Sequence, residues 1–101
     1  MAQVVWSDAA ERDLREIHDF IARDSPRYAA IVIRRLREAV SRLMLFPESD
    51  RRVPESQLRM HRELTVQPYR VICRYDREAD RVMVVRVVHG RRLLPALNGA
   101  G

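Results

Sequence analysis

The sequence predicts an α+β domain in the order β-α-α-β-β-β, with a helical hairpin packed on one face of a small, mostly antiparallel sheet. Three observations predict this class. Two runs rich in β-branched residues and tyrosine, 69–75 and 81–89, flank the polar segment 76–80, which is typical of a β-hairpin with a loop of about five residues. Apolar residues recur at helical spacing in two segments before residue 46. Shorter strand-like runs occur at 3–6 and 58–66.

The first strand and the first helix follow one another directly. Gln3–Trp6 is a short apolar run. Ser7 or Asp8 is expected to cap a helix over about residues 8–23, with Glu11 three residues after Asp8 as in a capping box. The apolar stripe of this helix is Ala10, Leu14, Ile17 and Ile21. Its outer face carries Arg12, Asp13, Glu16 and Asp19.

A second helix starts after a three-residue turn. Ser25 is the expected N-cap and Pro26 the first helical residue, and the helix is expected to run to about Leu45. Its buried stripe is predicted to be Ala29, Val32 or Ile33, Leu36, Val40 and Leu43. Trp6 and Phe46 are expected to pack the helices onto the sheet. Two helices joined this way form an antiparallel hairpin.

The sheet half begins after a polar loop at 47–54, with a strand over 58–66 and the hairpin beyond Gln67-Pro68. Side chains alternate across a strand, so the pattern assigns them to faces. One predicted face carries Val71, Cys73 and Tyr75, with Met83, Val85 and Val87 sharing one side of the second strand. The other carries Arg70, Ile72 and Arg74, together with Val82, Val84, Arg86 and Val88. A strand that is apolar on both sides is usually interior to a sheet.

Length and composition indicate one domain, 1–95, followed by a mobile tail, 96–101. All 19 basic residues are arginine, and the net charge of +5 divides into −1 for residues 1–50 and +6 for residues 51–101. Such a field attracts a nucleic acid or an acidic protein. The single cysteine, Cys73, is expected to be buried and suits a reducing compartment. Without a signal peptide or an apolar run of about 20 residues, the chain is expected to be cytoplasmic.

The mixed face of the hairpin is predicted to be a docking surface. Leaving its aliphatic residues in water would forgo roughly 1.5–3 kcal/mol each. An apolar patch rimmed by charge marks a site for a partner. The expected contact residues are Arg70, Ile72, Arg74, Val82, Val84, Arg86 and Val88.

Several segments together resemble the RelE/ParE superfamily of toxins from bacterial toxin–antitoxin pairs. They are V-V-W-S-D-A-A-E-R-D-L-R-E-I at 4–17, F-P…R-R-V-P-E at 46–55, R-E-L at 62–64, P-Y-R-V-I-C-R-Y at 68–75 and V-V-R-V-V-H-G-R-R at 84–92. Their order and spacing are closest to the ParE branch. The resemblance implies a helical hairpin on a small sheet, and an antitoxin whose often acidic C-terminal segment covers the docking surface.

Two activities occur in this superfamily. RelE-like members are similar in fold and cut messenger RNA on the ribosome, which implies Arg70, His89 and Arg92 (or Arg91) as a minimal nuclease site here. ParE-like members inhibit DNA gyrase and have no assigned hydrolytic site. No tyrosine follows Tyr75 and the chain has no lysine, so it departs from the RelE pattern. Arginine stabilises a phosphate but does not exchange protons near neutral pH, which leaves His89 as the nearby acid or base.

The sequence therefore favours a ParE-like toxin that inhibits gyrase by protein–protein contact through Arg91 and Arg92, with no catalytic residues. Operator DNA is expected to be bound only through the antitoxin, and no cofactor and no membrane contact are expected. His18 and His61 lack the spacing of a metal site. A RelE-like ribosome-dependent endoribonuclease is the alternative. A basic nucleic-acid-binding domain is a third possibility, but no aromatic-studded strand or basic recognition helix supports it.

Overall fold

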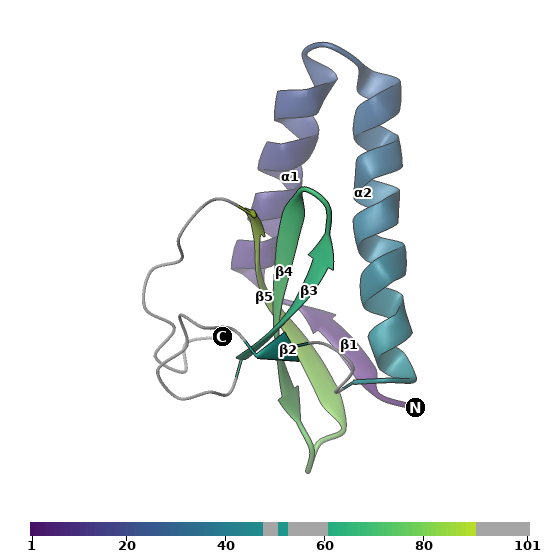
Figure 1. Ribbon diagram of the computed structural model, residues 1–101, viewed down its shortest axis with the longest axis vertical. Helices are drawn as coiled ribbons and strands as arrows, with labels where there is room; N and C mark the ends of the chain where they lie inside the picture. The colour runs from purple at the N-terminus through teal and green to yellow at the C-terminus, as the bar shows by residue number, and fades with distance from the viewer. Residues whose placement is uncertain (48–50, 53–60, 91–101) are drawn as a thin grey trace.

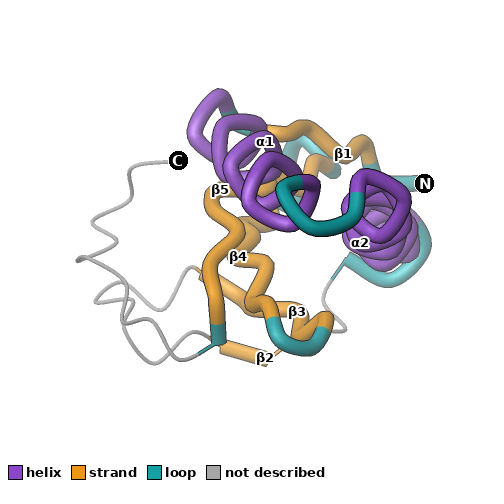
Figure 2. Tube along the Cα trace, turned by 90° about the horizontal axis from the view of Figure 1, so that it is seen from above, coloured by secondary structure: helices purple, strands orange, loops and turns teal. Residues whose placement is uncertain are grey.

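Two helices form an antiparallel hairpin on one face of a sheet, as the sequence predicts (Figures 1 and 2). The computed structural model describes residues 1–47, 51–52 and 61–90. The elements are β1 (Gln3–Trp6), α1 (Asp8–Ala22), α2 (Pro26–Ser41), the 3₁₀ turn η1 (Arg42–Met44), β2 (Arg51–Arg52), β3 (His61–Val66), β4 (Tyr69–Asp76) and β5 (Arg81–His89). Within the described ranges, the sheet has five strands in the order β1-β5-β4-β3-β2. Only β1 runs parallel to its neighbour, β5, so the predicted α+β class is confirmed.

Serine residues start both helices. The Ser7 hydroxyl accepts a hydrogen bond from the Ala10 N–H at 3.0 Å, and the Ser25 hydroxyl accepts one from the Tyr28 N–H at 3.1 Å. Each bond satisfies an N–H group that has no partner inside its helix. The sequence left Ser7 and Asp8 as alternative caps, and Ser7 is the cap. Its hydroxyl also donates to the Val85 carbonyl at 2.8 Å, so the cap ties α1 to β5.

The end of the second helix and the loop after it differ from the prediction. The second helix ends at Ser41 and tightens into η1, and the short strand β2 lies inside the predicted loop at 47–54. The third strand is described from His61, so the predicted residues 58–60 lie outside the described ranges. The proposed tail, 96–101, and the end of the predicted domain also lie outside them.

The main core fills the space between the helices and the sheet. Both predicted helical stripes contribute to it, as does Cys73, which is buried at 3% exposure. Trp6 packs partly buried against this core, with the Arg37 guanidinium 5.0 Å from its ring centroid. Phe46 was expected to pack here too, but it is 64% exposed. A 3₁₀ turn advances about 120° per residue instead of 100°, so η1 rotates Phe46 away from the helical stripe.

A β-bulge in β5 overturns the predicted assignment of faces. Ile72 pairs with Arg86, but the next residue, Cys73, pairs with Val84, so Val85 is the extra residue. An extra residue shifts the alternation by one, so side chains before and after it that the pattern assigned to one face lie on opposite faces. Val82 and Val84 therefore point into the core beneath the helices and are 0% exposed. Their predicted place on the docking surface was wrong.

Candidate functional site

Ile72 and Val88, the remaining aliphatic residues of the predicted docking surface, lie in a second, smaller cluster with Val85 and Met83, which were predicted on the opposite face. Ile72, Val85 and Val88 are 0%, 4% and 5% exposed, and Met83 packs against them. They belong to a cluster separate from the residues of the helices, which cover the other face of the sheet (Figure 2). Ile72 and Val88 were predicted to be exposed to solvent as part of an apolar patch, but both are buried.

Arg86 is bound within the protein by a side chain that the sequence placed on the outer face of the first helix. Asp13 is 8% exposed and accepts from Arg86 Nε at 2.8 Å, from Arg86 Nη2 at 3.1 Å and from the Val87 N–H at 2.8 Å. The pairing of β5 with β1 ends at Val84. Beyond that point Asp13 accepts the hydrogen bond of the Val87 N–H at this edge of β5. The hydrogen bond to Asp13 raises the pKa of Arg86 above its ordinary value. Arg86 is thus committed to an internal ion pair.

Arg70 also lies in an ion pair. Its Nε donates to Glu63 Oε2 at 2.7 Å and its Nη2 to Oε1 at 3.4 Å. The two side chains are only 12% and 0% exposed. They come from neighbouring strands and meet diagonally, because Glu63 lies opposite Ile72 and Thr65 opposite Arg70. The negative charge of Glu63 offsets the positive charge of Arg70.

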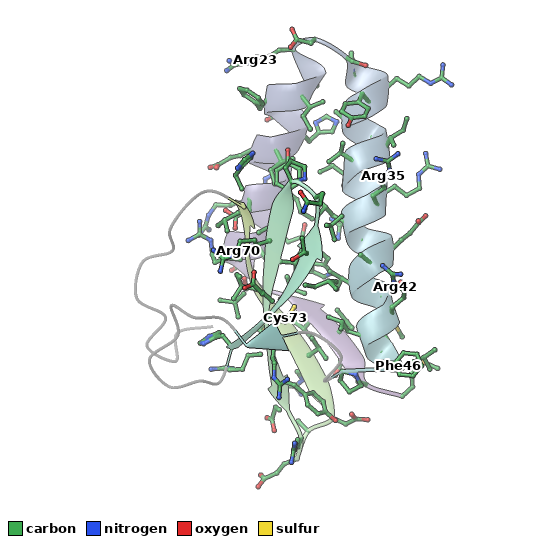
Figure 3. The ribbon with its side chains drawn as sticks, viewed as in Figure 1. Arg23, Arg35, Arg42, Phe46, Arg70 and Cys73 are labelled. Carbon is green, nitrogen blue, oxygen red and sulfur yellow. The ribbon has the colours of Figure 1, made fainter. Side chains whose placement is uncertain are left out.

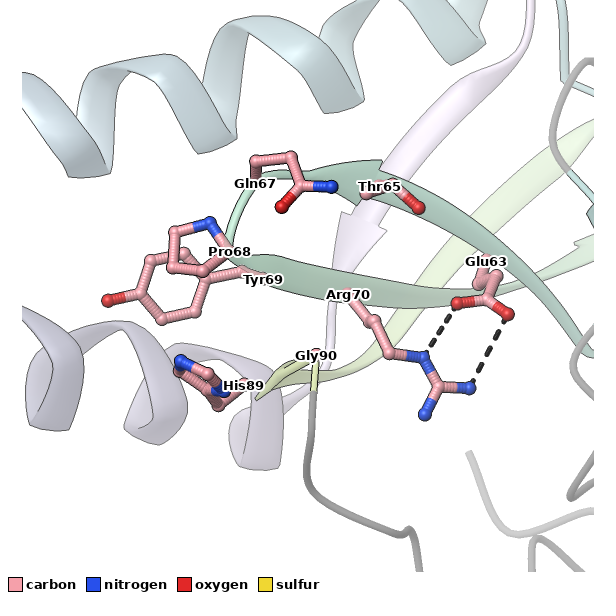
Figure 4. A pocket seen from close by; sticks show the side chains of 8 residues that line it. All are labelled: Glu63, Thr65, Gln67, Pro68, Tyr69, Arg70, His89 and Gly90. Carbon is pink, nitrogen blue, oxygen red and sulfur yellow. Dashed lines mark hydrogen bonds and ion pairs between the residues drawn. The ribbon is translucent and has the colours of Figure 1, made fainter.

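A pocket of about 500 Å³ lies beside this pair. It is lined by Glu63, Thr65, Gln67, Pro68, Tyr69, Arg70, His89 and Gly90. Figure 4 shows Arg70 extending toward Glu63, while the His89 ring lies beside Tyr69, in an edge-to-face contact with centroids 6.0 Å apart. Burial raises the pKa of the Tyr69 hydroxyl, so that hydroxyl keeps its proton at neutral pH.

The pocket joins two of the three candidate nuclease residues, Arg70 and His89. The third, Arg92, and its neighbour Arg91 lie outside the described residues. Gly90 closes the pocket: its N–H donates to the Pro68 carbonyl at 2.7 Å, and a Cβ there would come within 3.0 Å of that oxygen. The pocket offers His89 for proton transfer beside a guanidinium that already has a carboxylate partner.

Arg74 lies opposite His61 in the pairing of β3 and β4. His61 is 0% exposed. Burial, and secondly the charge of Arg74, lowers the pKa of His61 below 6.5. In the unfolded chain His61 takes up its proton near pH 6.5, whereas in the folded chain it does so only at lower pH.

The stability of the protein is therefore expected to fall as the pH drops below about 6.5 toward the folded pKa of His61. Urea unfolding at pH 7.5 and pH 5.5 checks this. The loss between the two values should be smaller in His61→Leu than in the native chain. An equal loss in both would contradict the assignment to His61.

No group of three His, Cys, Asp or Glu side chains that could hold a metal ion is found in the described residues. None of the helices in these ranges is long and apolar enough to cross a membrane.

The helical hairpin, the five-stranded sheet and the pocket between β3, β4 and β5 define a RelE/ParE-type toxin fold. The chain belongs to the family described as ParE toxin of the type II toxin–antitoxin system parDE, which it matches over residues 4–94. It is 40% identical to Toxin RelE2 of Caulobacter vibrioides over 93 residues, which are 92% of this chain and 100% of that protein. The protein is thus a toxin of a type II toxin–antitoxin system.

Solved structures show the same fold. The chromosomal ParDE system of P. aeruginosa superimposes with a TM-score of 0.71 at 22% identity, covering 88% of this chain and 96% of that one. The RelBE2 toxin–antitoxin complex of Mycobacterium tuberculosis gives 0.62 at 24% identity, covering 87% and 90%. The isolated E. coli RelE toxin gives 0.63 at 15% identity, covering 92% and 88%.

Proposed function

We propose that this toxin is of the ParE type and inhibits DNA gyrase by protein–protein contact, without a catalytic site of its own. The ion pair between Arg70 and Glu63 is the observation that carries the proposal. A nuclease needs a cation available to the phosphate in the transition state. At this position the guanidinium is 12% exposed and is held 2.7 Å from a fully buried carboxylate. The match to the ParE toxin family supports the same conclusion.

Gyrase supercoiling measured with the purified toxin tests the proposal. Relaxed plasmid, gyrase and ATP are incubated with increasing toxin, and supercoiling is expected to be lost as the toxin approaches stoichiometry with gyrase. Unchanged supercoiling at a tenfold excess of folded toxin would contradict it. Arg91 and Arg92 are the proposed contacts, so Arg91→Ala/Arg92→Ala is expected to restore supercoiling.

A RelE-like ribosome-dependent endoribonuclease is the second candidate. The observation that favours it is the pocket of about 500 Å³ that brings Arg70 and His89 together. The name of the relative at 40% identity, Toxin RelE2, points the same way.

His89→Ala separates the two candidates. His89 is exposed at the end of β5, so its loss is expected to leave the fold and the growth arrest caused by the toxin unchanged within about twofold. Loss of a general acid or base would instead reduce RNA cleavage by about 10²–10⁴-fold. The measurement is growth after induction, with transcript ends mapped in parallel. Loss of growth arrest together with loss of ribosome-phased cuts would overturn the gyrase proposal in favour of the nuclease.

Neutralisation by a cognate antitoxin is part of the same proposal. The structural relatives from the ParDE and RelBE systems support such a partner. The net charge of +6 on residues 51–101 favours an acidic antitoxin segment. Operator DNA would be bound through the antitoxin alone.

A further inference from the structure

The pocket beside Arg70 contains a carboxylate at a position where a guanidinium binds anions. Its lining includes both members of the ion pair between Arg70 and Glu63. Arg70 donates to the two Glu63 oxygens from Nε and Nη2, at 2.7 and 3.4 Å. Arginine binds carboxylate and phosphate groups with the same forked pair of N–H donors. Glu63 thus occupies a place that a phosphate group would take on Arg70.

Glu63 also cancels the charge of the pocket. Among the residues that line it, all of them in the described part of the chain, Arg70 is the only permanent cation and Glu63 the only anion. Figure 3 shows Arg70 well apart from Arg35 and Arg42, which lie along α2 and the turn after it. A phosphate in the pocket would therefore depend on Arg70, whose charge a fully buried carboxylate already balances. It would also bring a second negative charge next to Glu63, which is unfavourable.

The rest of the lining has the groups that a phosphate site uses. Thr65 on β3, Gln67 in the turn after it and His89 at the end of β5 are all exposed. Figure 4 shows their side chains around the same space as Arg70. Hydroxyl, amide and imidazole groups donate hydrogen bonds to phosphate oxygens. The pocket has these donors, but it has no net positive charge.

We propose that this pocket is a latent phosphate-binding site, and that Glu63 is the residue that excludes phosphate from it by binding Arg70 in its place. The ligand class is the phosphate group of a nucleotide or of a nucleic-acid backbone. The inference does not depend on gyrase as the target, because it concerns which anions the native pocket rejects.

Phosphate binding to Glu63→Gln tests the proposal. Glutamine has nearly the shape of glutamate and keeps one oxygen as an acceptor for Arg70, but it removes the negative charge. Inorganic phosphate and a 3′-mononucleotide are each titrated into the purified toxin, and the ring signals of the histidines are followed by NMR. Glu63→Gln is expected to bind both probes at least tenfold more tightly than the native toxin, because the lining then carries a net charge of +1.

Two matched variants show whether the effect belongs to the pocket. Glu78→Gln makes the same change in net charge at an exposed position in the turn between β4 and β5. It should change phosphate binding less than twofold. Glu63→Gln/Arg70→Gln removes the cation as well, and it should lose the binding that Glu63→Gln gains.

Thr65→Lys raises the charge of the pocket without removing either member of the ion pair. Thr65 is exposed and lies opposite Arg70. A lysine there also gives the lining a net charge of +1, so phosphate binding is expected to be at least fivefold tighter than in the native toxin. Substitutions at exposed positions usually have small effects on stability, so this variant is expected to fold even if Glu63→Gln does not. Circular dichroism checks the fold of each variant.

A folded Glu63→Gln that binds phosphate no better than the native toxin would overturn the proposal. If Glu63→Gln does not fold, the absence of any gain in Thr65→Lys would overturn it instead. Tight phosphate binding by the native toxin would also contradict it, as would an equal gain in Glu63→Gln/Arg70→Gln. Binding of the nucleotide without binding of inorganic phosphate would place recognition on the base or sugar, against the proposal. Supercoiling assays on the same variants report separately on gyrase inhibition.

Discussion

Replacing Asp13 with alanine is expected to lower the free energy of unfolding by about 3 kcal/mol. The substitution removes the acceptor of both Arg86 and the Val87 N–H, and it leaves a partly buried guanidinium and a buried backbone donor without this partner. A domain of this size is stable by about 5–15 kcal/mol, so the loss is a large fraction of the total. The midpoint of urea unfolding, measured by circular dichroism, reports it.

Glu11→Ala is the matched control. Glu11 is a carboxylate of the same helix that also bonds an arginine, Arg37, but the two side chains are 37% and 47% exposed. Exposed pairs contribute about 0.2–1 kcal/mol, so the control should unfold close to the native midpoint. Asp13→Asn keeps one oxygen for the Val87 N–H and should fall between the two. Similar midpoints for Asp13→Ala and Glu11→Ala would show that Asp13 does not stabilise the edge of β5.

The elements of the fold could be predicted from the sequence because their signals are local. A serine before a periodic apolar stripe starts each helix, and a proline after Ser25 fixes the start of the second. The bulge at Val85 gives no such signal. Valines lie on both faces of β5, so a shift of one residue in the alternation leaves the sequence pattern equally apolar on each face. Val82 and Val84 were assigned to the wrong face for that reason.

Long-range pairs were harder to predict than strands. Asp13 bonds a strand 73 residues away, and its sequence context does not distinguish it from Glu16 or Asp19 on the same helix. The pairing of Glu63 with Arg70 did have a signal. The short turn at Gln67-Pro68 fixes the register of β3 and β4, which places Glu63 diagonally across from Arg70.

Glu63→Ala is expected to lower the free energy of unfolding by about 3–5 kcal/mol. It leaves the Arg70 guanidinium, 12% exposed, without the carboxylate that now binds it. Glu63→Leu/Arg70→Met removes both charges and keeps the volume, and such replacements are often neutral or stabilising. Urea unfolding of the single and double variants measures the difference. A double variant as unstable as Glu63→Ala would mean that the pair itself, and not an uncompensated charge, sets the stability.

Glu63→Leu/Arg70→Met also distinguishes a structural role of Arg70 from a role in activity. It removes the cation from the pocket and is expected to leave a folded protein that can be assayed. If Arg70 serves only to balance Glu63, Glu63→Leu/Arg70→Met retains gyrase inhibition, and its half-inhibitory concentration lies within about threefold of the native value. A phosphate-binding arginine in a nuclease would instead be indispensable, since removal of one electrostatic contact to the transition state costs about 10²–10³-fold in rate. Growth arrest and supercoiling, measured on a variant shown to be folded, therefore test whether Arg70 stabilises the sheet or takes part in chemistry. Loss of both activities at native stability would assign it to the active surface.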